Sequence, residues 1–263
     1  MNGKYVTDKN PQRDHSLEDL DKRIESDRRI AVTAFEATFS QQVVTAIAAI
    51  GEINQIANAR IQADTRVAAA RIASHAEVTC IELLSTVELT ALKIDKLKSE
   101  NSRETNVANK KIITQFVDEA RLEIEDSCNS SVEEIKRYGD MAIAQVSENS
   151  RTAIEKIQGH VAKVKADIEQ NEKIAVEKLA VSKEEERTLK SAAEDGEAAR
   201  LKISRFSEEA ANKLTEISSE AILNINKLSS AVLKEISSVV TIAEAKVLKM
   251  KTVTLSRLSE ILN

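Results

Sequence analysis

The strongest constraint on the fold is an apolar repeat with a period of eleven residues. Large aliphatic side chains recur at this spacing in three series that cover most of the chain. Eleven residues make three turns of about 3.67 residues each, close to the 3.6 of an α-helix, so each series lies on one helical face. The series are Ile50, Ile61, Ile72, Leu83 and Ile94; then Ile113, Ile124, Ile135, Val146, Ile157, Ile168 and Leu179; then Ile203, Leu214, Ile225, Ile236, Val247 and Leu258. A parallel track beside the third series comprises Phe206, Ile217, Leu228, Val239, Met250 and Ile261.

The composition argues for long helices rather than a compact domain. The chain has one proline, Pro11, and five glycines, so few residues favour turns, and aromatic residues make up 2% with no tryptophan. Charged residues at 31% beside hydrophobic residues at 42% are typical of long helices and coiled coils. The sequence therefore predicts an all-α fold: a long, nearly continuous helix with eleven-residue (hendecad) repeats that forms a right-handed coiled coil or a helical filament.

The predicted handedness follows from the period. Because about 3.67 residues per turn exceeds the 3.6 of a straight helix, the apolar seam drifts in the direction opposite to that of a heptad seam. The recurrent positions span roughly 100° of the helical wheel, which is wide enough to contact several neighbouring helices. A small residue accompanies each large one, as in the pairs Ala142-Ile143 and Ala153-Ile154.

The three series do not share one frame. Ile94 and Ile113 are 19 residues apart, and Leu179 and Ile203 are 24 apart, so the phase shifts at each junction. The intervening stretches are the most polar parts of the repeat region. Either the helix adjusts its winding there as one continuous rod, or the chain bends between three helical segments. We expect the continuous rod.

These features divide the chain into seven parts. Ser16, followed by acidic residues, is a predicted helix N-cap. We expect a flexible polar head at 1–15, an N-terminal helical segment at 16–45, hendecad blocks at 46–97, 112–181 and 201–263, and polar phase-shift segments at 98–111 and 182–200.

No sequence pattern points to catalysis, a metal or a cofactor. The chain contains no His-Glu-x-x-His pair, phosphate-binding Gly loop or nucleophile elbow. We therefore expect no enzyme activity and no cofactor. His75 and His160 lie at or beside the apolar stripe, where a polar edge is the simpler interpretation and a metal-binding ring of imidazoles in an assembly is the alternative. The acidic run at 184–186 is interpreted as a solvated helical face, with a docking patch for a basic partner as the alternative.

The two cysteines, Cys80 and Cys128, lack the spacing of a metal site or a disulfide framework. A reducing compartment is therefore expected, and the cytoplasm is the default because no secretory signal or membrane-spanning segment is present. Cys128 occupies the same repeat position as Val117, Gly139, Ser150 and Val161. It should point toward the seam and could serve there as a seam thiol.

An uncovered stripe of Ile, Leu and Val requires another helix to cover it. The leading hypothesis is a structural protein that associates with itself, through the seam residues named above, into a homo-oligomeric rod, stalk or filament. A net charge of −5 of mixed sign provides no basic face for nucleic acid, so nucleic acid is not expected as a partner.

Two other functions remain open. The repeat length resembles that of apolipoproteins, perilipins, synucleins and late embryogenesis abundant proteins, which implies an amphipathic coat on a lipid or polymer surface. The absence of Trp and the abundance of β-branched Ile in the seam favour helix packing over a lipid surface. A tethering or signalling coiled coil is the second alternative.

Overall fold

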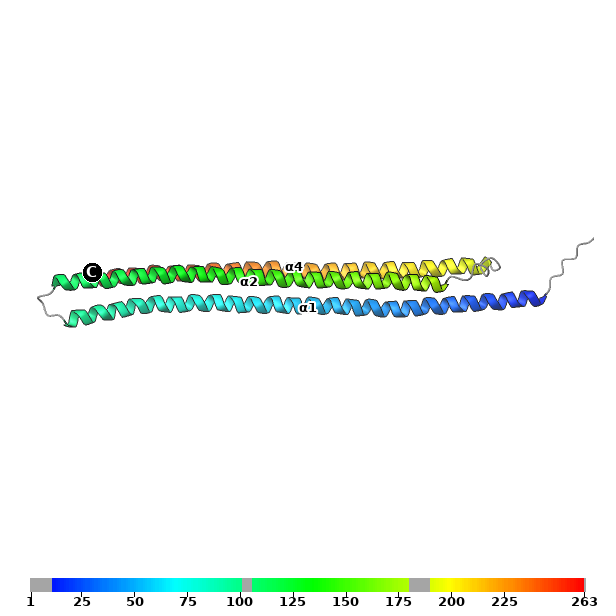
Figure 1. Cartoon of the computed structure of the whole chain (residues 1–263), viewed down its shortest axis with the longest axis horizontal. Helices are drawn as coiled ribbons and strands as arrows, with labels where there is room; N and C mark the ends of the chain where they lie inside the picture. The colour runs from blue at the N-terminus through cyan, green and yellow to red at the C-terminus, as the bar shows by residue number, and fades with distance from the viewer. Residues whose placement is uncertain (1–10, 101–105, 180–189, 263) are drawn as a thin grey trace, which may run out of the picture. The chain divides into compact units, whose positions relative to one another are not determined.

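Three long helices make up the structure, which is a computed structural model describing residues 11–100, 106–179 and 190–262. The helices are α1 (Pro11–Glu100), α2 (Asn106–Leu179) and α4 (Lys190–Leu262) (Figure 1). Every described residue is helical, so the fold is all-α as predicted.

The expected continuous rod is wrong, because the helices pack against one another within one chain. Thr79 and Ser131, 52 residues apart, share a hydrogen bond of 2.7 Å between α1 and α2. Lys246 and Glu77, 169 residues apart, form an ion pair of 3.2 Å between α4 and α1. The alternative of three helical segments is therefore correct. The repeat changes phase between the series because each series belongs to a separate helix with its own frame.

Helix α1 begins at Pro11, five residues before the predicted N-cap Ser16. Proline suits the first turn of a helix, where its missing N–H group would have no intrahelical partner. Residues 11–15, predicted to belong to the flexible head, are therefore helical. The rest of that head, residues 1–10, lies outside the described residues.

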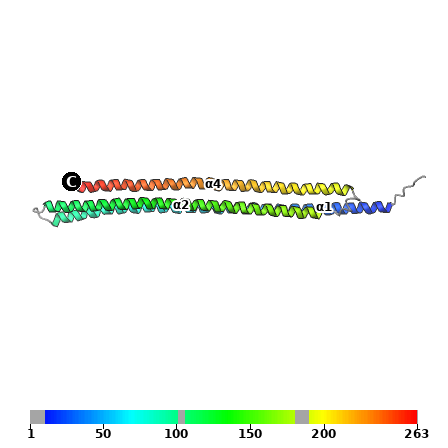
Figure 2. The same cartoon turned by 45° about the horizontal axis from the view of Figure 1, so that its top comes forward.

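The chain divides into two units. Unit 1 comprises Met1–Gln55 and Ile154–Leu223, and unit 2 comprises Ile56–Ala153 and Asn224–Asn263. Each unit contains a segment of all three helices, and within each unit these segments lie side by side (Figures 1 and 2).

Contacts in unit 2 define the helix directions. From Asp64 to Thr79 along α1, the hydrogen-bonded partners on α2 run backwards from Asn149 to Ser131, so α1 and α2 are antiparallel. Helices α2 and α4 are also antiparallel, since Gly139 lies against Val240 and Arg121 donates a hydrogen bond to Ser259.

In unit 1, α1 and α4 run in the same direction. Arg28 of α1 lies against Gly196 of α4, and further along Glu36 forms an ion pair of 3.4 Å with Lys202. Asn171 of α2 donates a hydrogen bond of 3.1 Å to Gln42 of α1. The three segments of this unit are thus joined by polar contacts at the rim of their core.

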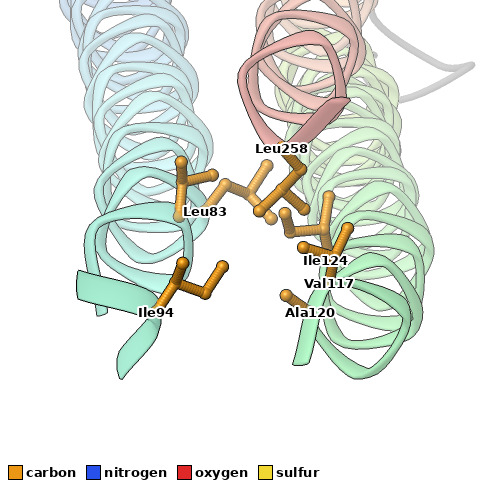
Figure 3. Close-up of a cluster of buried hydrophobic side chains, with 7 residues drawn as sticks. Leu83, Ile94, Val117, Ala120, Ile124 and Leu258 are labelled. Atoms are coloured by element: carbon orange, nitrogen blue, oxygen red, sulfur yellow. The ribbon is translucent and has the colours of Figure 1, made fainter. Parts of the chain in front are cut away.

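The core of unit 2 is built from side chains of all three helices. Figure 3 shows Leu83 and Ile94 of α1, Ile124 of α2 and Leu258 of α4 pointing into the space between the helices. All four are at most 1% exposed. A second cluster of this unit contains Ile72, Cys128, Ile135 and Val247. Full burial of one such aliphatic side chain stabilises the fold by about 1.5–3 kcal/mol relative to exposure.

Small side chains flank the large ones and allow the helices to approach closely. On α4 the buried residues beside the large track are Ser207, Ser218, Ser229, Ala210, Ala221, Val232, Ala243 and Thr254. One close approach is at Gly139 of α2, where a Cβ atom would lie 2.5 Å from Cγ2 of Val240 on α4. This separation is far shorter than the 3.5–4.0 Å or so of normal carbon contacts, so only glycine fits without rearrangement.

The core of unit 1 extends beyond the predicted seam. Val32, Phe35, Phe39 and Val43 of α1 are buried, and the rings of Phe35 and Phe39 stack with centroids 5.1 Å apart. The sequence carried a signal for this part of the core, because a step of eleven residues back from Ile50 reaches Phe39.

Candidate functional site: the outer face of α1

The residues predicted to join copies of the chain lie in its own core. Members of the three series are at most 2% exposed, except for Ile113, which is half-buried against the same core. The parallel track on α4, from Phe206 to Ile261, is half-buried throughout. The chain's own helices therefore cover these side chains, and a second copy is not needed to do so.

Both thiols are also buried. Burial raises the pKa of Cys128 and of Cys80 above the usual range, while the positive charges of Lys251 and Lys246, respectively, oppose that rise. Cys128 is among the groups that raise the pKa of Cys80, and both thiols are buried in unit 2. The predicted seam thiol, Cys128, is 0% exposed and faces its own chain.

The histidines of the apolar stripe lie in different surroundings. In unit 2 the ring of His75 meets the ring of Tyr138 edge-on, with centroids 5.6 Å apart, and the guanidinium of Arg71 lies 4.0 Å above the Tyr138 ring. The hydrogen bond from Tyr138, followed by that from Arg137, lowers the pKa of Glu134 beside them. Tyr138 therefore joins α1 to α2 on the surface of this unit.

His160 of unit 1 borders a shallow open groove of about 330 Å³ between α1 and α2, together with Thr38, Gln41, Gln42, Thr45, Ala46, Val164 and Asp167. A second open groove, of about 510 Å³, lies between α2 and α4 of the same unit. Glu169, Glu172, Glu197, Lys173, Arg200, Val176, Leu201 and Ser204 line it. In this groove Ser204 donates a hydrogen bond to Glu172.

Within residues 11–100, 106–179 and 190–262, no three His, Cys, Asp or Glu side chains cluster in a way that could hold a metal ion. In the same ranges, no helix has a stretch both long and apolar enough to cross a membrane. The acidic run at 184–186 lies outside the described residues.

The most distinctive surface is a second apolar track on the outside of α1 in unit 2. Ile56, Val67, Val78 and Leu89 follow one another at eleven-residue spacing, and Ile81 and Leu92 form a parallel pair at the same spacing. We call these six residues the outer stripe. Their exposed fractions lie between 48% and 68%.

The outer stripe lies opposite the core. With about 100° of rotation per residue, its centre is roughly 160° around the helix from the core track of Ile61, Ile72 and Leu83. Exposed small residues, including Ala59, Ala70 and Ser74, lie within the outer stripe, and no bulky side chain stands between its members. Helix α1 of unit 2 is therefore apolar on two opposite faces.

Charged residues border the outer stripe in an ordered way. Arg60, Arg66 and Arg71 flank its first half, and Glu77, Glu82 and Glu88 flank its second half; all six are exposed. Between residues 60 and 88 the flanking charges are therefore basic in the first half and acidic in the second, and exposed Lys93 follows beyond them. This surface was not predicted from the sequence, because only the core track of this helix was followed, although the outer stripe has the same period.

No family model matches the chain, and no curated protein matches it. Among solved structures, a computationally designed three-helix bundle is similar, with 11% sequence identity and a TM-score of 0.45, covering 93% of this chain and 99% of the designed one.

Proposed function

We propose that the chain is a structural protein: a hendecad three-helix coiled coil with a right-handed twist, whose copies join into a rod, stalk or filament. The observation that supports this role best is the burial of the eleven-residue track. In both units the track places large aliphatic side chains in the core, as with Ile157 of unit 1 and Ile135 of unit 2, each 0% exposed. The large side chains of the repeat thus pack the helices of one chain against one another.

The polar groups of the described residues also favour a structural role over catalysis. The buried hydrogen bond between Thr79 and Ser131 joins two helices, as does the bond of 2.6 Å that Asn149 donates to Asp64. Such paired polar groups select one register between helices, because any slip would leave a buried group without a partner.

A core substitution tests the structural role. Ile157→Asp places an uncompensated charge in the core of unit 1, which is expected to lower the free energy of unfolding by about 3–5 kcal/mol. Glu155→Lys changes an exposed residue two positions away on the same helix and should alter it by less than about 0.5 kcal/mol. Urea unfolding followed by circular dichroism measures both. Equal effects of the two variants would contradict the assignment of the track to the core.

The assembly itself is tested separately. Sedimentation equilibrium of the wild-type chain should reveal species larger than the 29.0 kDa monomer. A monomer at all accessible concentrations would refute self-assembly and leave only a folded helical bundle.

A further inference from the structure

We propose that the outer stripe of α1 binds a second copy of this chain, with the two α1 helices antiparallel. This inference rests on the proposed self-assembly and names the surface that carries it. The aliphatic side chains of the eleven-residue repeat cannot supply the contact between copies, since the chain's own helices already bury them.

The size of the outer stripe matches a stable contact. Its six aliphatic residues, exposed by 48–68%, extend over residues 56–92, or about 54 Å of helix at ~1.5 Å per residue. Together they present roughly 600 Å² of accessible surface, while a standard stable interface buries about 800 Å² per partner and is roughly 60% apolar. The small residues within the outer stripe allow two helix axes to approach to about 8–10 Å.

The pattern of flanking charges selects the antiparallel arrangement. A parallel pair in register would bring the arginines of both copies together at one end and the glutamates of both together at the other. In an antiparallel pair with Val67 beside Val78 of the second copy, Ile56 meets Leu89, and Arg60 and Arg66 come close to Glu82 and Glu77 of the second copy. Arg60 and Arg66 of each copy then face glutamates of the other, while Arg71, which lies over Tyr138 of its own chain, falls beside the two-fold axis. The interface is the same on both copies, as two-fold symmetry requires.

A second copy fits this surface better than a lipid bilayer does. Interfacial helices usually carry basic residues along their whole apolar border and insert Trp or Phe. Half of the outer stripe is bordered by glutamates, which anionic headgroups repel, and its apolar residues are all Ile, Val or Leu.

The first test compares two substitutions of exposed apolar residues in unit 2. Val67→Glu places two negative charges, one from each copy, in the centre of the proposed interface. The dimer dissociation constant in sedimentation equilibrium should therefore rise at least about 100-fold. Leu122→Glu, on α2, replaces a residue of similar exposure (63% against 68%) outside the outer stripe and should leave the constant unchanged. Circular dichroism should show the same helix content in both variants.

The second test determines orientation with new cysteines. In the antiparallel pair, position 59 of one copy lies near position 85 of the other, while the two copies of position 59 are about 39 Å apart, far beyond the ~7 Å that a disulfide spans. Ala59→Cys and Ser85→Cys chains should therefore form covalent dimers on oxidation when mixed, but not when each is oxidised alone. Wild-type chains, whose own thiols are buried, serve as the control.

The outcomes separate this inference from the proposed function. Wild-type chains that associate equally well with Val67→Glu would overturn the outer stripe as the interface and leave self-assembly intact. Covalent dimers of Ala59→Cys alone would overturn the antiparallel arrangement. Monomeric wild-type chains would overturn both self-assembly and this interface. If such monomers co-float with phosphatidylglycerol vesicles through Val67, the outer stripe is a lipid-binding face.

Discussion

Replacing Gly139 by alanine tests the close contact between α2 and α4 in unit 2. An alanine Cβ at this position would lie 2.5 Å from Cγ2 of Val240. Val240 is a β-branched residue within a helix, where about 90% of valines adopt one χ1 rotamer, so its methyl group cannot simply rotate away. The two helices must therefore separate locally.

The expected magnitude follows from two opposing effects. Alanine in place of glycine inside a helix stabilises it by about 0.5–1 kcal/mol, because the unfolded chain loses less freedom on folding. Overpacking by one methyl group in a close contact costs about 1–3 kcal/mol. The free energy of unfolding of Gly139→Ala should thus fall by about 1 kcal/mol.

A matched control lies in the same helix. Around Gly159 a new Cβ would meet no atom within 4 Å outside the local helix backbone, so Gly159→Ala should raise the free energy of unfolding by about 0.5–1 kcal/mol. Urea unfolding followed at 222 nm measures both variants. In a Val240→Ala background Gly139→Ala should also become stabilising. If Gly139→Ala is as stabilising as Gly159→Ala in the wild-type chain, the close approach of α2 and α4 at this position is wrong.

Two further predictions concern buried groups of unit 2. Ser131→Ala removes a partner from the buried hydroxyl of Thr79 and should lower the free energy of unfolding by about 1 kcal/mol. The double variant Thr79→Val/Ser131→Ala should lower it by less than the sum of the two single variants. Strict additivity in urea unfolding would argue against the hydrogen bond. Because burial raises the pKa of both thiols, Cys80 and Cys128 should react slowly with iodoacetamide at pH 8 and rapidly in urea. The folded chain keeps thiol protons that the unfolded chain releases, so this contribution to stability is fully present below the ordinary thiol pKa of 9.0 and is lost as the pH rises above it. A Cys80→Ala/Cys128→Ala variant should show a smaller loss between pH 8 and pH 10 than the wild-type chain, and an equal loss would assign the pH dependence to other groups.

The sequence predicted the helical fold and the faces of the helices that are apolar, because period alone decides which side chains share a face. Ile61, Ile124 and Leu214 illustrate this: each was assigned by spacing, and each is fully buried. The period does not encode what covers the face. A helix of another copy and a helix of the same chain would cover this face with the same kind of aliphatic side chain. A seam between copies and a core within one chain therefore show the same sequence pattern.

The helix ends were harder to predict for a related reason. The shift in spacing between Ile94 and Ile113 is compatible with an adjustment of winding or with a new helix. Proline would distinguish the two, but the only proline of the chain, Pro11, begins α1. The outer stripe had a clear signal, the spacing of Ile56, Val67, Val78 and Leu89, which the core track of the same helix obscured.

The pairing of α1 with α4 has a consequence for how the chain folds during its synthesis. Glu77 and Lys246, which form an ion pair between these helices in unit 2, are separated by 169 residues. At about 5–20 residues per second, a ribosome needs roughly 10–30 s to synthesise this interval. During that time α1 and α2 can form a hairpin, but the side of it that α4 later covers is open to water. Apolar surface exposed in this way favours aggregation until α4 is complete.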